Sequence, residues 1–326
     1  MGMKALSLLV ALGVALGCAA SKAQTFPSRP VTIVVPYGPG GPADILARIL
    51  AERMRGPLGQ PVVVENVAGA AGTMGVSRVV RAAPDGYTLS YGNWGTHVLN
   101  GVIQKVSYDV LTDLDPIALL PDNPYIVVTN SRVPANNLHE LLAWLKANPN
   151  TASQGTGGSG SGSHVIGIYF QSLTGTRYQF VPYRQGTAGQ TQDLLSGQIQ
   201  MMFDQPSNAV PHVLSGRIKA HAVLAKERLA MAPDIPTVDE AGLSGFYVST
   251  WYGLWAPKGT PPDVIAKLNA AAVEALADPA VTQRLTGMGF AIAPRGRQSP
   301  EALGAHHKAE IAKWSAIIKA AGVKAE

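Results

Sequence analysis

Residues 36–42 combine glycine and proline in the order Pro-Tyr-Gly-Pro-Gly-Gly-Pro, and they separate two segments of contrasting pattern. The apolar, β-branched run 31–35 comes directly before them, and residues 43–55 follow with apolar side chains at helical spacing. A strand–turn–helix unit of this kind leaves backbone N–H groups free at the positive end of the helix dipole. Those groups attract an anion without a charged side chain, so the turn predicts a site for a ligand such as a carboxylate.

This turn supplies the first candidate ligand-binding residues. Gly41 is placed to cap the helix, with Pro42 at its first position. Asp44 has two open roles: it can stabilise the helix start, or it can face the ligand and favour a hydroxyl or ammonium group. The alternative for the whole turn is a tight connection whose glycines supply positive φ angles. The candidates are Tyr37, Gly38, Pro39, Gly40, Gly41 and Asp44.

A second glycine-rich stretch, residues 155–160, matches the pattern GxGxxG. We reject a dinucleotide site, because residues 151–154 do not read as a strong strand and no acidic residue follows at the required distance. The stretch instead places N–H and O–H donors before a helix predicted over 164–173, with Ser163 as its N-cap; the alternative is a surface loop. The candidates here are Gly160, Ser161, Gly162, Ser163 and His164.

Two further turns follow predicted strands. In the first, Trp94 can stack on a flat ligand or belong to the core, and its neighbours Asn93, Gly95 and Thr96 add hydrogen-bonding groups. The second follows the strand 180–183, where Arg184 can pair with a carboxylate or lie in solvent, and Thr187 can cap the next helix.

Motifs for catalysis and for metal binding are absent from the sequence. No GxSxG, HExxH or Walker A pattern occurs, and the only adjacent histidines, His306 and His307, point to different sides of a predicted helix. Ser163 and His164 are adjacent at a helix start, which rarely gives triad geometry. We therefore expect no catalytic residue, no metal ligand and no cofactor.

The N-terminal residues predict a secretory signal peptide, residues 1–23. Lys4 precedes an apolar stretch over 5–17, and small residues at 21 and 23 suit cleavage before Gln24. A lipoprotein anchored at Cys18 is the second choice. Cys18 is the only cysteine, so cleavage leaves a chain without disulfides or thiol chemistry. The expected location is the periplasm.

Composition agrees with a protein that is stabilised by its core and binds small molecules. The chain has 326 residues, 46% hydrophobic, with a formal net charge of +5 and only 14% charged residues. No cluster of lysine and arginine stands out, so we do not expect a nucleic acid partner.

Strand and helix patterns alternate along most of the chain, which predicts an α/β fold with parallel or mixed sheets flanked by helices. The segments 121–125 and 248–251 are the best candidates for connections between two domains. We predict one domain over 24–122 and 249–326, with the second, 123–248, inserted. Ligands of open α/β sheets bind outside the carboxyl ends of the strands, so a cleft between two such edges is expected.

Ten motifs in order make the chain resemble the Bug family of extracytoplasmic solute receptors, the binding components of tripartite tricarboxylate transporters. The resemblance runs from about Phe26 to the C-terminus. Its motifs are FPSRP (26–30), VPYGPGGPAD (35–44), AGAAGTMG (68–75), APDGYTL (83–89), GTH (95–97), SGSHVIGIYF (161–170), VPYR (181–184), DLLSGQIQMMFD (193–204), PDIPTVDEAGLSGF (233–246) and WYGLWAPKGTP (251–261).

The resemblance implies a periplasmic, type II Venus-flytrap binding protein that is a monomer, is not an enzyme, and delivers a small carboxylate to a membrane permease. Ligands of the family include di- and tricarboxylates, acidic amino acids and aromatic acids. The loops 37–44 and 160–164 would hold opposite ends of the ligand. The turn 93–96, together with Tyr183, Gly186, Thr187 and Asp204, would complete the cleft. Two other hypotheses stay open: a hydrolase using Ser163 and His164, and a receptor that reports to a sensor kinase.

Overall fold

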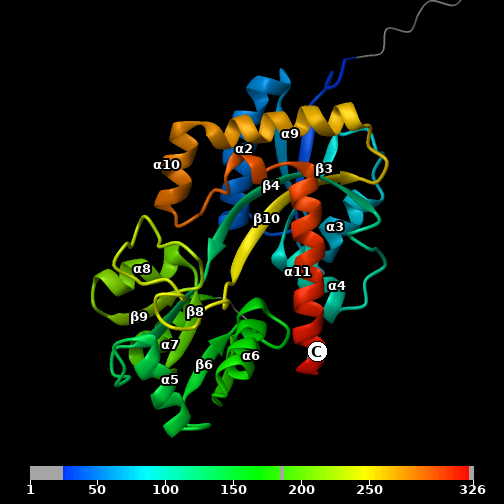
Figure 1. Ribbon diagram of the computed structural model, residues 1–326. Coiled ribbons are helices and arrows are strands. Elements are labelled where there is room, and N and C mark those ends of the chain that lie inside the picture. Colours follow the sequence, from blue (N-terminus) through cyan, green and yellow to red (C-terminus); the bar gives the residue numbers. More distant parts are fainter. Residues whose placement is uncertain (1–24, 184–186, 323–326) are drawn as a thin grey trace, which may run out of the picture.

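The computed structural model describes residues 25–183 and 187–322 (Figure 1). The predicted signal peptide, the lipidation alternative at Cys18, and the candidates Arg184 and Gly186 lie outside these residues. In the part of the chain that the structure describes, no helix combines the length and the apolar character needed to cross a membrane.

The first sheet has five strands in the order β2-β1-β3-β10-β4. The N-terminal strands β1, β2 and β3 are parallel, whereas β10 runs antiparallel to both of its neighbours, β3 and β4. Strand β1 is almost fully buried, as its continuous β-branched sequence predicts for a strand covered on both faces. The bounds are β1 Val31–Val35, β2 Val62–Asn66, β3 Thr88–Asn93, β4 Leu114–Pro124 and β10 Ser249–Pro257.

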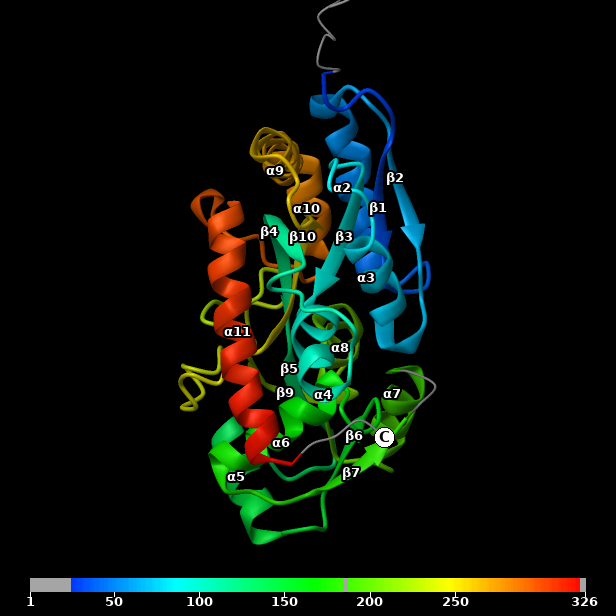
Figure 2. The same cartoon turned by 90° about the vertical axis from the view of Figure 1, so that its right-hand side faces the viewer.

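Helices cover both faces of this sheet (Figures 1 and 2). One face carries α2 (Pro42–Leu58) and α9 (Pro262–Ala277), with α10 (Pro279–Gly287) beside α9. The opposite face carries α3, η2, α4 and the C-terminal helix α11, which places η2 and α4 next to the ends of β3 and β10. Their bounds are α3 Thr73–Val80, η2 Gly95–Leu99, α4 Asn100–Ile103 and α11 Pro300–Ala320.

The second sheet repeats this pattern in the order β7-β6-β8-β5-β9, with β6 parallel to β7 and β8, and β5 antiparallel to β8 and β9. Helices α5 and α6 cover one face, and α7 and α8 cover the other. The strands are β5 Ile126–Asn130, β6 Ser153–Thr156, β7 Gln179–Pro182, β8 Met201–Asp204 and β9 Ile218–Val223. The helices are α5 Leu138–Ala147, α6 Gly162–Thr174, α7 Thr187–Ser196 and α8 Pro206–Leu214.

The predicted α/β class is therefore confirmed, as two mixed sheets flanked by helices. The sheets are joined where three extended segments pair: Tyr125 N donates to Val248 O (3.1 Å), Val248 N to Leu224 O (3.0 Å) and Leu224 N to Tyr125 O (2.8 Å). We call this region the waist. The strands of the first sheet lie within 31–124 and 249–257, and those of the second within 126–223. The division of the chain into domains at the predicted residues stays a prediction.

Candidate functional site

A cleft of about 680 Å³ lies between turns that come from both sheets. The first sheet contributes three segments, and the second contributes the loop between β6 and α6, on the side of the molecule that Figure 2 shows. None of the lining residues carries a charged side chain, so the polar groups of the cleft are backbone amides, hydroxyls and side-chain amides. The lining residues are Pro36, Tyr37, Gly38, Ala68, Gly69, Ala70, Ala71, Gly72, Gly95, Leu99, Asn100, Ile103, Gln104, Gly157, Ser159, Gly160, Ser161 and Gly162.

The two sides of the cleft touch at glycines of the β6–α6 loop. A Cβ atom built on Gly160 would lie 3.2 Å from Cγ2 of Ile103. One built on Gly162 would lie 2.9 Å from Cζ3 of Trp94, which is closer than a side chain tolerates. Gly162 is thus required by close approach, and the segments following Val35 and preceding Val165 share one crevice.

The turn after β1 forms as its sequence predicts, with Gly41 as N-cap and α2 beginning at Pro42. Its carboxylate, Asp44, is buried and accepts from Gly40 N (2.9 Å), Arg48 Nε (2.9 Å) and Asn66 Nδ2 (2.9 Å). The bond from Arg48 contributes most to holding the pKa of Asp44 down at about 2. All three donors lie within the protein, as the structural role of Asp44 requires. Tyr37 and Gly38 line the cleft, whereas Pro39, Gly40, Gly41 and Asp44 do not.

A hydrogen-bonded cluster fixes Tyr37 against the turn after β3. The Tyr37 hydroxyl donates to Asn93 Oδ1 (2.8 Å), which also accepts from Thr96 N (3.1 Å). Burial raises the pKa of Tyr37 to about 12, so the phenol stays protonated and acts as a donor. Of this turn only Gly95 lines the cleft; Asn93 and Thr96 lie buried behind it. Trp94 is also buried, at 2% exposure, and packs against Trp314.

The loop before α6 differs in one detail from the prediction. Ser161, not Ser163, is the N-cap: its Oγ accepts from His164 N at 3.4 Å. Ser163 Oγ instead accepts from Gly157 N (3.0 Å), and Gly160 N donates to Nδ1 of His164 (3.2 Å). Residues 151–154, which do not read as a strong strand, overlap the short strand β6 at Ser153–Thr156. Gly160, Ser161 and Gly162 line the cleft, whereas Ser163 and His164 lie beside it.

The remaining candidates lie outside the lining of the cleft. The Tyr183 hydroxyl donates to Asp193 Oδ2 (2.5 Å), and Thr187 is the exposed first residue of α7. Asp204, at the end of β8, is buried and accepts from Gln205 N (2.8 Å) and Asn208 Nδ2 (2.5 Å). Burial raises the pKa of Asp204 to about 6. Their assignment to the ligand site stays a prediction.

Two wall segments were missed by the sequence reasoning, residues 68–72 and the helical residues around Ile103. The available signal for the first was its glycines: Gly69 and Gly72 have φ angles of 130° and 90°. Asn100 Nδ2 donates to Ala71 O (2.8 Å) and ties the two segments together. For Leu99 and Ile103 no local signal separates a cleft wall from an ordinary core position.

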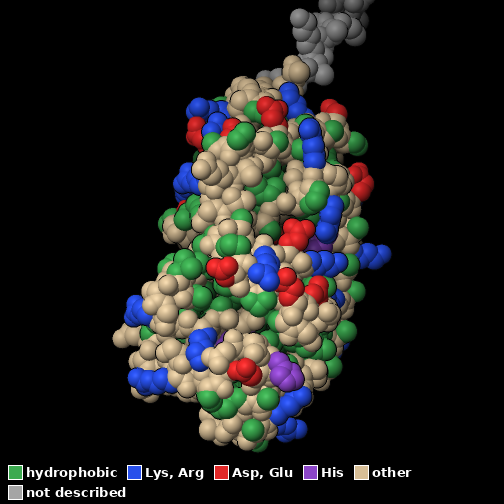
Figure 3. Space-filling model, turned by 60° about the vertical axis from the view of Figure 1, so that its left-hand side comes forward, with side chains coloured by type: hydrophobic (Ala, Val, Ile, Leu, Met, Phe, Trp, Pro, Cys, Tyr) green, Lys and Arg blue, Asp and Glu red, His purple; other side chains and the backbone are tan. Residues whose placement is uncertain are grey.

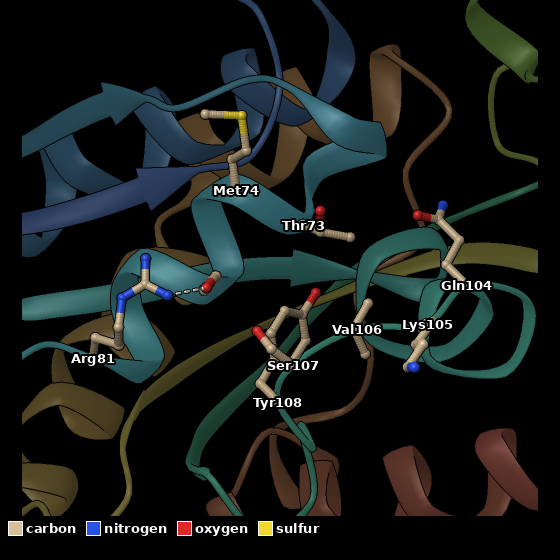
Figure 4. A pocket seen from close by; sticks show the side chains of 9 residues that line it. Thr73, Met74, Arg81, Gln104, Lys105, Val106, Ser107 and Tyr108 are labelled. Atoms are coloured by element: carbon tan, nitrogen blue, oxygen red, sulfur yellow. Dashed lines mark hydrogen bonds between the residues drawn. The ribbon is translucent and has the colours of Figure 1, made fainter.

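A smaller pocket of about 350 Å³ adjoins this wall, and Gln104 lines both. Figure 4 shows Arg81 at one end of it and Lys105 at the other; the Arg81 guanidinium donates to Ser77 Oγ. The pocket contains none of the predicted site residues. Within residues 25–183 and 187–322, no group of three or more histidine, cysteine, aspartate or glutamate side chains is arranged to hold a metal ion.

Comparison with known proteins gives consistent matches over nearly the whole chain. The model of the tripartite tricarboxylate transporter family receptor matches residues 46–323. BugT of Bordetella pertussis is 34% identical over 304 residues, which cover 93% of this chain and 92% of BugT.

Two solved structures from Rhodopseudomonas palustris are similar in fold and sequence. MatC, solved with bound malate, is 38% identical with a TM-score of 0.75, and the match covers 90% of this chain and 100% of that one. Rpa4515, solved with adipate, is 30% identical with a TM-score of 0.77, and the match covers 92% and 99% of the two chains.

Proposed function

The chain belongs to the tripartite tricarboxylate transporter receptor family, the Bug-type solute-binding receptors, and from this premise we propose that it captures a small aliphatic dicarboxylate in the cleft between its two sheets. The family consists of substrate-binding receptors, so the hydrolase hypothesis is not retained. In this proposal the protein acts in the periplasm as a monomer and delivers its ligand to the membrane component of a tripartite transporter.

One observation carries the proposal: unpaired backbone donors from both sheets line the same cleft. Gly38, before α2, and Gly162, the first residue of α6, both line it. Within the described residues, no acceptor is hydrogen-bonded to the N–H group of either glycine. A dicarboxylate has an anionic group at each end, so one end can bind the turn before α2 and the other the start of α6, which draws the two parts together.

The neutral lining supports a ligand held by dipoles and not by ion pairs. Backbone N–H groups bind a carboxylate through charge-assisted hydrogen bonds, and burying the ligand strengthens these bonds. The hydroxyl of Ser161 and the amides of Asn100 and Gln104 are further neutral groups at the wall. Malate and adipate, found in the two similar structures, are both dicarboxylates.

Two features favour an aliphatic over an aromatic acid. Trp94, the residue that suggested stacking, is buried against Trp314 and does not line the cleft. Tyr37 does line it, but its hydroxyl is held by Asn93. The wall thus offers small glycine and alanine residues with Leu99 and Ile103, which suit an aliphatic chain.

A thermal-shift screen tests the proposal with succinate, malate, adipate and citrate, with phthalate as the aromatic comparison. At a ligand concentration about 100-fold above Kd, binding adds about 2.7 kcal/mol to the free energy of unfolding, which raises the melting temperature. We expect a shift with at least one aliphatic diacid and none with its diamide, which has the same shape without charge. A screen in which no carboxylate shifts the melting temperature contradicts the proposal.

A further inference from the structure

A second cavity, of about 470 Å³, lies at the waist and shares no lining residue with the cleft. We call it the waist pocket. Its walls come from the end of β4, the segments 224–227 and 247–251, the loop 291–297 and one face of α11. Figure 3 shows this side of the molecule, where lysine or arginine and aspartate or glutamate side chains gather around the middle over a partly hydrophobic surface.

The waist pocket combines charges of both signs with an apolar floor. Lys226, Arg297 and Lys313 supply positive charge, and Asp122, Glu227 and Glu310 supply negative charge. Within the described residues, no direct ion pair involves any of these six side chains. The floor includes Leu119, Leu224 and the ring of Trp251.

Two of these charged groups, Lys313 and Asp122, are half-buried and have an oppositely charged neighbour in the pocket, but no ion pair in direct contact. Lys313 Nζ donates to Tyr247 O (3.1 Å) and lies 4.9 Å from the centroid of the Trp314 ring; burial lowers the pKa of Lys313, and the charge of Glu310 acts in the opposite direction. Burial likewise raises the pKa of Asp122, whose carboxylate bonds to Ser249. Desolvated charges are costly unless they are paired, so each group favours a ligand of opposite charge.

Glu310 contributes to the geometry of the pocket as well as its charge. Its Oε2 accepts from the indole Nε1 of Trp251 (3.2 Å) and of Trp314 (3.0 Å). These two bonds fix the carboxylate beside the Trp251 ring. An ammonium group placed there would meet a carboxylate whose position is fixed, which attracts cations through charge-assisted hydrogen bonds.

We propose that the waist pocket is a second binding site and that it takes a small zwitterion with an apolar body, of the class of the neutral amino acids. The ammonium group of the ligand lies toward Asp122 and Glu310. Its carboxylate lies toward Lys313 and Arg297, and its side chain covers the floor at Leu224 and Trp251. This site shares no lining residue with the dicarboxylate cleft, so the two ligands do not compete for the same space.

Occupation of the waist pocket also affects the cleft. The walls of the pocket include Leu224 and Tyr247, from the segments that return from the second sheet, and Leu119 and His306, which belong to the part built on the first sheet. A change in the angle between the two parts alters this cavity, so a zwitterion that binds one arrangement better changes the affinity of the cleft, and the effect is reciprocal.

Calorimetric titration of the mature chain tests the proposal, with L-valine, L-leucine and L-phenylalanine as probes. Leucinamide and 4-methylpentanoate are the matched analogues, each carrying only one of the two charges. We expect at least one amino acid to bind, and the single-charge analogues to bind at least about tenfold more weakly. Absence of binding by all three amino acids at millimolar concentration overturns the proposal, and so does equal binding of the anionic analogue.

Variants locate the site and separate it from the cleft. Lys313→Met and Asp122→Asn are expected to weaken amino acid binding at least about tenfold, whereas Lys308→Met, at an exposed position of the same helix, leaves it unchanged. Gly38→Trp fills the cleft and should leave amino acid binding intact while removing dicarboxylate binding. Amino acid binding that is lost in Gly38→Trp but kept in Lys313→Met contradicts the waist site. Melting curves establish whether each variant is folded. If Asp122→Asn is unfolded, the amino acid affinity of Lys313→Met alone tests the proposal.

Discussion

The indole rings of Trp94 and Trp314 pack edge to face, with centroids 4.8 Å apart and an interplanar angle of 60°. Trp94 belongs to the turn after β3, behind the cleft, and Trp314 belongs to the C-terminal helix α11. Trp314 also packs against Tyr169 of α6, the helix that begins at the cleft, at 5.6 Å. Helix α11 thus joins the cleft turn of the first sheet to the cleft helix of the second, in agreement with its position alongside both in Figures 1 and 2.

Substitution of Trp314 by alanine should destabilise the protein by about 3–5 kcal/mol, because the ring is 1% exposed and its removal leaves a cavity between the two parts. Chemical denaturation measures the loss. Trp314→Phe keeps an edge-to-face partner for Trp94 but loses the bond to Glu310, so its cost should be smaller. A Trp314→Ala variant within about 1 kcal/mol of the wild type would contradict the joining role of α11.

Filling the cleft from one side should abolish dicarboxylate binding. Gly38 lines the cleft, and a Cβ atom added to it would meet no other atom within 4 Å, so Gly38→Trp introduces a large ring without a clash in the backbone turn. The matched control is Gly56→Trp, at an exposed and equally open position of α2. Calorimetry with the best diacid of the screen should show binding only for the control. Unchanged affinity in Gly38→Trp would place the ligand elsewhere.

Gly162→Ala tests the close approach of the two sides. The added Cβ would lie 2.9 Å from the Trp94 ring, so either the loop or the ring must move, at a cost of about 1–3 kcal/mol. The same displacement should weaken ligand binding, because Gly162 N–H is a proposed donor. Gly101→Ala in α4, where nothing lies within 4 Å, is the control and should have little effect on either quantity. Stability is measured by denaturation and affinity by calorimetry.

The pH dependence of stability should report on Asp44. The pKa of Asp44 is lowered in the fold from 3.8 to about 2, so the folded state binds fewer protons than the unfolded chain between these values. The resulting stability is fully present above pH 3.8 and is lost as the pH falls toward 2. Because Arg48 is half exposed, we expect Asp44→Asn to cost only about 1–2 kcal/mol at pH 7, and the difference from wild type to shrink below pH 4.

The control for this prediction is Asp85→Asn, which removes an exposed pair with Arg29. Its effect should stay below about 1 kcal/mol at every pH, because solvent screens such pairs. A pH profile for Asp44→Asn parallel to that of the wild type down to pH 2 would show that the Arg48 and Gly40 bonds do not stabilise the charged carboxylate.

The sequence by itself determined the features that depend on neighbouring residues. The run 31–35 had to be a buried strand, and Gly41 with Pro42 had to begin a helix, because the β-branched residues and the fixed φ of proline act locally. The sequence did not determine the N-cap of α6, because two nearby serines could both fill that position. Ser161 and Ser163 both precede α6, and Ser161 became the cap once Ser163 bonded to Gly157.

Only the tertiary structure decided which of the candidate residues face a common space. Trp94 is buried because it packs against Trp314. The two residues are 220 positions apart in the chain, so no local sequence pattern predicts their contact. For the same reason, residues 68–72 and Ile103 can be recognised as a cleft wall only from the tertiary structure, in which the loop at Gly160 packs against Ile103. Secondary structure follows from short-range backbone preferences, whereas a cleft between two sheets depends on how distant side chains pack. The sequence therefore specified the turns, and the packing of distant side chains specified which of them line one cleft.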